Sequence, residues 1–156
     1  MEKHCAMKDM RTIALALSLF AGLPLSAQLN PVSWTFESRA LGEGEYELVM
    51  TADLDPGWNI YSQYLESDDG PVRTSFYFEL PDGVELLGKT SEEGHRKEGY
   101  DSLFDMNVVK FSGRVVFRQR VKAPAGGHIQ GAVEYMTCDD ERCLPPREVP
   151  FSIALQ

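Results

Sequence analysis

HIQGAVEYM (128–136), TCDDERCLPPR (137–147) and EVPFSIAL (148–155) make up the last part of the chain. The first and third segments are typical of β-strands. The middle segment holds Cys138 and Cys143, with four residues between them. Two cysteines where the strands of such a hairpin are joined have a Cα spacing that suits a disulfide. Both the bonded and the open state are therefore sterically possible.

Two interpretations of this cysteine pair follow from the residues alone. The pair is either a reversible dithiol that exchanges electrons or a structural disulfide, and most cysteine pairs in secreted domains are structural. A disulfide that closes so short a ring restricts the unfolded chain little, by about 2 kcal/mol in the chain-entropy estimate. This small gain weakens the structural interpretation but leaves both open.

The start of the chain predicts export. Lys3, Lys8 and Arg11 precede an apolar run over residues 12–23, and small residues follow up to Ala27. This pattern indicates a secretory signal peptide over residues 1–27, too short and wrongly flanked to be a membrane span. Cys5 is removed with it, and the remaining even number of cysteines favours an intramolecular pair in an oxidising compartment.

Residues 28–156 are expected to form one domain with its own core. Removing residues 1–27 takes away three basic and two acidic side chains, so the formal net charge changes from −9 to −10. Such an acidic domain is not expected to bind nucleic acid or an anionic membrane surface. No later apolar run has the length of a membrane span, so we expect no direct membrane insertion after the signal is removed.

The rest of the chain reads as short strands separated by Gly- and Pro-containing turns. Val32, Trp34 and Phe36 alternate with polar residues, and Tyr46, Leu48, Met50 and Ala52 alternate in the same way. Further strands are expected at 75–80, 84–87, 108–111 and 114–121. The pattern predicts an all-β protein, an immunoglobulin-like β-sandwich of about eight or nine strands.

Residues 89–105 (KTSEEGHRKEGYDSLFD) break this pattern, because they are charged and show no strand alternation. We expect a long loop, which is either a solvated excursion or a flap over a functional site. Tyr100 is the candidate ring that covers the cysteines, and Phe104 is expected to anchor the start of the next strand in the core.

Three segments carry a resemblance to a known family. They are GWNIYSQ (57–63), the charged segment before Phe104, and YMTC (135–138) with CLPP (143–146) and VPF (149–151). Together they resemble the N-terminal periplasmic domain of the thiol:disulfide interchange reductase DsbD, over essentially all of residues 31–155. The cysteine segment followed by Pro-Pro is the most specific part of this resemblance.

The resemblance implies an immunoglobulin-like fold with a redox-active dithiol near one end. By position, Cys138 and Cys143 match the redox pair, Tyr61 matches an aromatic residue that lines the site, and residues 92–100 match a cap that shields it. In that family the domain takes electrons from a thioredoxin-like donor, here expected to be membrane-linked, and passes them to periplasmic thiol-redox acceptor proteins. A periplasmic location is therefore expected. The competing interpretation is an exported, non-enzymatic binding or chaperone-like β-sandwich with a structural Cys138–Cys143 disulfide.

The chain departs from the family pattern in three ways. Four residues separate the cysteines where the family member used for comparison has five, and Leu144 stands where that member has an aromatic residue. The full reductase continues into membrane and thioredoxin-like domains, whereas this chain stops at Gln156. We therefore expect a free-standing domain whose electron donor is another polypeptide. Leu144, with Pro145 and Pro146, is expected to give Cys143 an apolar shoulder for a docking partner.

The expected chemistry requires no metal and no organic cofactor, because thiolate attack, a mixed disulfide and its resolution involve only cysteines. His95 and His128 have no spacing typical of a zinc site and are expected at the surface. Asp139, Asp140 and Glu141 lie between the cysteines. Their charge either raises the thiol pKa, partly offset by Arg142, or only keeps the turn solvated.

Overall fold

The computed structural model describes residues 29–156. The expected signal peptide at 1–27 lies outside the described residues. These residues form nine β-strands: β1 (Val32–Gly42), β2 (Glu45–Leu54), β3 (Asn59–Tyr61), β4 (Ser75–Glu79), β5 (Glu85–Asp101), β6 (Met106–Lys122), β7 (His128–Tyr135), β8 (Thr137–Cys138) and β9 (Arg147–Ala154). In this part of the chain there is no helix long and apolar enough to cross a membrane.

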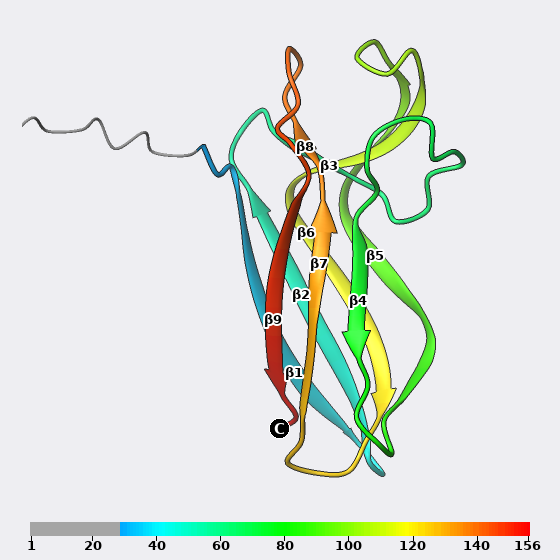
Figure 1. Cartoon of the computed structure of the whole chain (residues 1–156), viewed down its shortest axis with the longest axis vertical. Helices are drawn as coiled ribbons and strands as arrows, with labels where there is room; N and C mark the ends of the chain where they lie inside the picture. Colours follow the sequence, from blue (N-terminus) through cyan, green and yellow to red (C-terminus); the bar gives the residue numbers. More distant parts are fainter. Residues whose placement is uncertain (1–28) are drawn as a thin grey trace, which may run out of the picture.

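The strands form two antiparallel sheets (Figure 1). The larger sheet has the order β1-β2-β6-β3-β8, and β5 pairs with the other edge of β6. The smaller sheet has the order β4-β7-β9. Strand β6 is long enough to pair with both β2 and β3 along one edge, since β2 takes its second half and β3 its first half. This central strand therefore links the core of the sandwich to the short strands that carry the cysteine segment.

The alternation in β1 and β2 produces the core between the two sheets. Leu48, Met50 and Ala52 of β2 are fully buried, and Trp34 and Phe36 of β1 pack against them. From the smaller sheet, Phe76, Phe78, Tyr135, Phe151 and Ile153 join the same cluster. Aromatic rings from both sheets are in contact, for example Trp34 with Tyr135 at 5.5 Å between centroids. The prediction of an all-β sandwich is confirmed.

The expected long loop at 89–105 is wrong. Most of it is the 17-residue strand β5, which pairs with β6 from Glu85 opposite Lys122 to Asp101 opposite Met106. The prediction failed because β5 pairs with only one neighbour and its residues 93–100 are exposed on both faces, so no apolar alternation is needed. A turn of only four residues (102–105) joins β5 to β6.

Strand β5 follows β6 through two irregularities, after Leu87 and after Gly94. The second one requires glycine, because a Cβ at position 94 would lie 2.9 Å from the carbonyl oxygen of Arg114 and 3.3 Å from Cα of Val115. The two expected strands at 108–111 and 114–121 are one continuous strand, β6, which passes through Gly113 at a φ of 69°.

Three connections meet at one end of the sandwich, opposite the C-terminus (Figure 1). They are the turn after β8, the β5–β6 turn and the loop of residues 62–74. Residues from all three contribute to a small second core around Tyr61, Leu65, Val108 and Cys138, which we call the end cluster. This end of the domain holds the cysteines.

Candidate redox site

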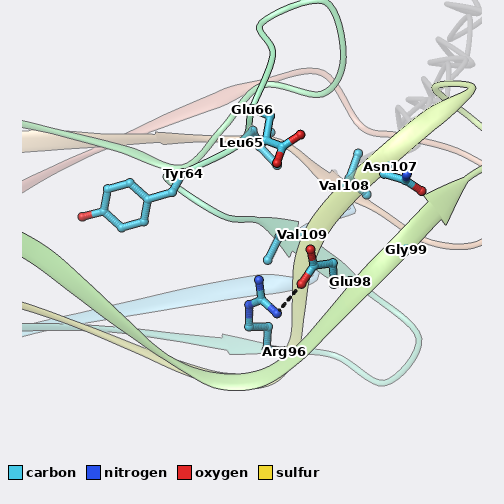
Figure 2. Close-up of a pocket in the computed structure, with 9 residues that line it drawn as sticks. All are labelled: Tyr64, Leu65, Glu66, Arg96, Glu98, Gly99, Asn107, Val108 and Val109. Atoms are coloured by element: carbon cyan, nitrogen blue, oxygen red, sulfur yellow. Dashed lines mark hydrogen bonds and ion pairs between the residues drawn. The ribbon is translucent and has the colours of Figure 1, made fainter.

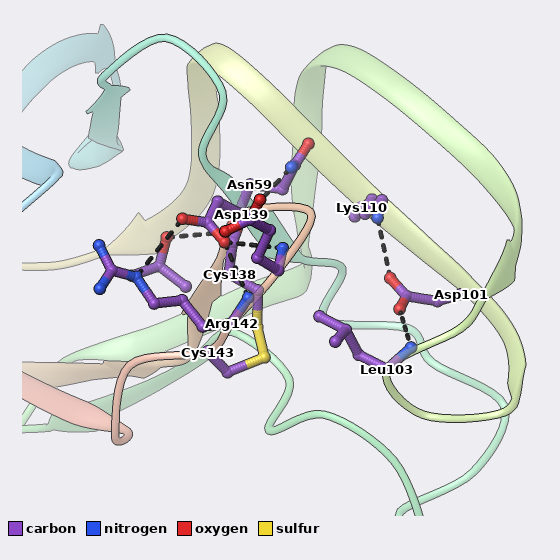
Figure 3. Close-up of polar contacts among 10 residues, drawn as sticks. Asn59, Asp101, Leu103, Lys110, Cys138, Asp139, Arg142 and Cys143 are labelled. Carbon is purple, nitrogen blue, oxygen red and sulfur yellow. Dashed lines mark hydrogen bonds and ion pairs between the residues drawn. A yellow bond between two sulfur atoms is a disulfide. The ribbon is translucent and has the colours of Figure 1, made fainter.

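Cys138 is held in place by the short strand β3. Asn59 lies opposite Cys138 and Ile60 lies opposite Thr137 in the β3–β8 pair. The Thr137 hydroxyl donates to the carbonyl oxygen of Asn59 at 2.9 Å, and the Asn59 amide donates to the carbonyl oxygen of Cys138 at 3.5 Å (Figure 3). Main-chain and side-chain contacts therefore fix Cys138 to β3 of the larger sheet.

The second cysteine returns beside the first through a tight turn. The backbone N–H of Asp139 donates to the carbonyl oxygen of Arg142 at 3.0 Å, and that of Leu144 donates to the carbonyl oxygen of Thr137 at 2.9 Å. These bonds bring the Cα atoms of Cys138 and Cys143 to 4.0 Å, and a disulfide joins the two residues (Figure 3). The pairing, which the residues alone left open, is present in the structure.

The two sulfurs have different environments. Cys138 is only 2 % exposed and belongs to the end cluster, whereas Cys143 is partly exposed and packs against that cluster from outside. An incoming thiol must reach a sulfur along a free approach, so accessibility limits the reaction of a buried cysteine. Cys143 is therefore the more exposed residue of the pair.

Asp139 organises the turn between the cysteines. Its carboxylate accepts hydrogen bonds from the backbone N–H groups of Glu141 at 2.9 Å and Arg142 at 2.8 Å. These two bonds hold the pKa of Asp139 below its usual value. The Arg142 guanidinium lies 3.6 Å from the same carboxylate and 5.9 Å from the centre of the Trp58 ring. Unlike Asp139, the side chains of Asp140 and Glu141 are exposed.

Tyr61 forms the floor of the site. Its ring is fully buried in the end cluster with Cys138 and meets the Phe104 ring edge to face, at 5.7 Å between centroids. The Tyr61 hydroxyl is buried and has no hydrogen-bond partner within residues 29–156. Burial raises the pKa of Tyr61, and the charge of Asp101 raises it further. Tyr61 is therefore neutral at all physiological pH values.

The structure corrects the expected cap. Residues 92–100 do not lie over the cysteines but are part of β5, paired with β6. Tyr100 is 66 % exposed, and its hydroxyl donates to the carboxylate of Asp105. Phe104, expected to be a strand anchor, packs against the end cluster. The roles differ because Tyr100 belongs to a strand that ends beside the site, whereas the four-residue turn directs Phe104 inward.

The β5–β6 turn is held by an ion pair between a buried aspartate and a partly exposed lysine, which sequence reasoning missed. Asp101 is only 5 % exposed, and its carboxylate accepts hydrogen bonds from Lys110 Nζ at 2.8 Å and from the backbone N–H of Leu103 at 3.0 Å (Figure 3). An Asp at the start of a short polar turn, such as Asp101-Ser102, is the signal that could have indicated this role. The turn also lies close to the cysteine segment, since Leu103, Lys110, Asp139 and Asp140 line a common surface depression.

The comparisons with known proteins agree with this arrangement. Residues 26–154 match the family model described as "Thiol:disulfide interchange protein DsbD, N-terminal". The chain belongs to this family. The match covers nearly all of the residues that follow the expected signal peptide, and it confirms the resemblance seen in the cysteine segment and around Trp58. The chain is thus a thiol–disulfide interchange domain with a Cys138–Cys143 disulfide.

Two solved structures share the fold of this DsbD N-terminal family member. The DsbD N-terminal domain of Neisseria meningitidis in the reduced form is 14 % identical, with a TM-score of 0.50, and the match covers 76 % of this chain and 83 % of that one. The N-terminal periplasmic domain of ScsB from Proteus mirabilis is 16 % identical, with a TM-score of 0.51, over 80 % of this chain and 44 % of that one. No curated protein sequence matches the chain significantly.

Leu144 follows Cys143 directly in this DsbD-type site. It is half-buried, and its backbone N–H is bonded to Thr137, whereas Pro145 and Pro146 are exposed. The three residues thus form an apolar edge beside the more exposed cysteine. Within residues 29–156, no group of three or more His, Cys, Asp or Glu side chains is arranged to hold a metal ion.

A polar groove of about 380 Å³ lies beside the redox site (Figure 2). Tyr64, Leu65 and Glu66 line it from the loop after β3, and Arg96 and Glu98 line it from β5, where they form an ion pair at 2.7 Å. No cysteine lines this groove. Two of its lining residues, Leu65 and Val108, also belong to the end cluster that contains Cys138.

Proposed function

We propose that this domain relays electrons through Cys138 and Cys143, from a thioredoxin-like donor to thiol-redox acceptor proteins. The observation that supports this best is the asymmetry of the disulfide, with one buried and one partly exposed cysteine, in a chain of the DsbD N-terminal family. A purely structural disulfide has no need of a sulfur that a partner can reach.

The relay proceeds in two halves. A donor thiolate attacks Sγ of Cys143, the Cys138–Cys143 bond breaks, and Cys138 leaves as a thiolate that takes up a proton. A second donor thiol attacks the mixed disulfide, so the donor leaves oxidised and the domain becomes a dithiol. The Cys143 thiolate then attacks an acceptor disulfide, and Cys138 resolves the new mixed disulfide. Two electrons and two protons pass to the acceptor, and no cofactor takes part.

The surroundings of the pair support this chemistry. Tyr61 and Phe104 pack in the end cluster with Cys138, and the exposed edge formed by Leu144, Pro145 and Pro146 offers a partner an apolar contact. Sulfur–aromatic contacts contribute about 0.3–1.5 kcal/mol, so a docking protein can replace them with contacts of its own. The site is thereby suited to react with docked proteins rather than with small oxidants.

We also propose a periplasmic location, reached through a signal peptide cleaved after Ala27. The basic residues and the apolar run at 12–23 support export. The similar ScsB domain is described as periplasmic, and an oxidising compartment suits a cysteine pair. In this role the domain is the electron-carrying component of a protein-disulfide reductase.

The reduction potential of the pair tests this proposal. The purified domain is equilibrated with thioredoxin and with glutathione buffers, and the dithiol fraction is measured by mass-tagging of free thiols. We expect a potential above about −300 mV, in the range of exchangeable disulfides. A much lower potential, together with resistance to thioredoxin, would instead favour the structural disulfide of a binding or chaperone-like β-sandwich.

A further inference from the structure

The segment between the cysteines is held by one side chain of its own. Asp139 accepts hydrogen bonds from the backbone N–H groups of Glu141 and Arg142, and its own backbone N–H donates to the carbonyl oxygen of Arg142. All three bonds fall inside the ring that the disulfide closes. The carboxylate therefore fixes the backbone path that returns Cys143 to Cys138.

These hydrogen bonds affect the balance between dithiol and disulfide, because the disulfide closes the ring only in the oxidised state. In the dithiol, only non-covalent contacts keep the segment between the two cysteines in its ring-closing path. Without such contacts the reduced segment gains conformational entropy, which favours the dithiol over the disulfide. Hydrogen bonds to an ionised acceptor are among the stronger ones in proteins, so Asp139 opposes this gain effectively.

The contacts outside the ring hold only the two ends of the segment between the cysteines. The hydrogen bonds that hold the turn itself all involve Asp139. Cys138 is fixed to β3, and the N–H of Leu144 is bonded to Thr137, so both ends of the segment are held by strands. Inside the ring, Arg142 touches Trp58 through its side chain only. Asp140 makes no hydrogen bond or ion pair among the residues that the structure describes.

We propose that Asp139 is a positioning residue that sets the redox equilibrium of Cys138 and Cys143 by holding the turn between them in its ring-closing path in both redox states. This inference rests on the proposed function in that it concerns the same cysteine pair. It assigns Asp139 a role distinct from those of Asp140 and Glu141: all three carry charge near the sulfurs, but Asp139 also shapes the ring.

Four proteins separate this role from a simple charge effect: the wild type, Asp139→Ala, Asp139→Asn and Asp140→Ala. Asparagine at position 139 removes the charge but keeps an oxygen that can accept the same two N–H groups. Asp140→Ala removes a charge from the same turn without removing a hydrogen bond. Each protein is equilibrated with a series of dithiothreitol buffers, and the dithiol fraction gives the equilibrium constant of the pair.

We expect Asp139→Ala to shift the equilibrium toward the dithiol about tenfold, which raises the potential by about 30 mV for a two-electron couple. Asp140→Ala should shift it less than about threefold, and Asp139→Asn should lie between the two. An Asp139→Ala shift no larger than that of Asp140→Ala or Asp139→Asn means that only charge matters, and it overturns the proposal.

A second measurement does not depend on the alanine variant being folded. In the reduced wild type, hydrogen exchange of the Glu141 and Arg142 amides should be slowed compared with the intrinsic rates of unprotected amides. Exchange at the intrinsic rates shows that the turn is not held in the dithiol, and the proposal fails. Because dithiothreitol is a small reductant, these outcomes are separate from the proposed relay, whose failure appears as resistance of the wild-type pair to thioredoxin.

Discussion

The ring of Phe104 meets the ring of Tyr61 edge to face, with 5.7 Å between centroids and 83° between planes. Tyr61 belongs to β3, which carries the cysteine segment through β8, and Phe104 belongs to the turn between β5 and β6. The contact therefore joins two parts of the chain that are distant in sequence, within the end cluster that also contains Cys138. It makes the β5–β6 turn the part of the structure most suited to control access to the disulfide.

The first prediction concerns Phe104. Phe104 packs against the end cluster that contains Cys138. In the reduced domain, Phe104→Ala should therefore increase the rate of alkylation by iodoacetamide about two- to tenfold, the size of effect expected if its ring covers a sulfur. The matched control is Tyr100→Ala, because Tyr100 is an exposed ring next to the same turn. Alkylation is followed by mass spectrometry. An equal acceleration in both variants, or none in Phe104→Ala, would show that Phe104 does not cover the site.

The second prediction concerns the sulfur that is attacked. Since Cys143 is partly exposed and Cys138 is buried, a thioredoxin-like protein should form its mixed disulfide with Cys143. Cys138→Ala removes the resolving thiol and should accumulate the covalent complex, whereas Cys143→Ala should form at least tenfold less. Non-reducing gel electrophoresis with a thioredoxin that lacks its own resolving cysteine measures the complex. The reverse ratio would mean that the site opens before reaction, and equal failure of both variants would count against a relay.

The third prediction concerns Gly131 in β7. A Cβ at this position would lie 2.2 Å from the carbonyl oxygen of Tyr77 and 2.6 Å from the ring of Phe151. Gly131→Ala should therefore lower the free energy of unfolding by about 1–3 kcal/mol, the usual cost of overpacking. Urea denaturation of the oxidised domain measures the change. Gln130→Ala, at the exposed neighbouring position, should change stability by less than about 0.5 kcal/mol.

The fourth prediction concerns pH. Asp53 of β2 lies opposite Arg114 of β6, whose Nε and Nη2 donate to its carboxylate at 2.7 and 3.1 Å. The hydrogen bond from Arg114 lowers the pKa of Asp53, burial opposes this effect in part, and the charge of Arg114 lowers the pKa further. A lowered pKa in the folded state means that the stabilisation is complete above the unfolded value of about 3.9 and is lost as pH falls through the folded value.

Asp53→Asn should therefore melt at a lower temperature than the wild type at pH 6, and the two melting temperatures should converge near pH 2. Circular dichroism melts over this pH range measure the difference. Arg114→Gln should show the same gap at pH 6, since it removes the other member of the pair. A gap that persists unchanged at pH 2 would show that the ion pair is not its cause.

Much of the fold follows from local sequence pattern. Alternation placed Trp34 and Phe36 of β1, and Leu48 and Met50 of β2, on the inward faces where the structure has them. This works because both faces of those strands have a fixed environment, with the core on one side and solvent on the other. Cys138 and Cys143 lie between two predicted strands with four residues between them, and this local spacing indicated the possible bond that the structure has.

Strand β5 could not be predicted in this way. Its exposed residues need no alternation, and its strand conformation comes from pairing with β6 along its whole length. The ion pair of the buried Asp101 with Lys110 was missed for a related reason, since a charged residue in a polar segment gives no sign of burial until its partner is placed. The expectation that Tyr100 covers the cysteines followed from the mistaken loop.

The sequence by itself determined the strands of the core and the family, and it indicated that Cys138 and Cys143 could pair, because these depend on residue type and on spacing along the chain. Only the tertiary structure decided that Cys138 is buried and Cys143 is partly exposed, and that Phe104 rather than Tyr100 packs beside them. Burial is a property of contacts between distant segments, here β3, β8 and the β5–β6 turn. Leu144, Pro145 and Pro146 mark Cys143 in the sequence as the cysteine with an apolar shoulder, but a local pattern does not show which of the two cysteines the fold buries.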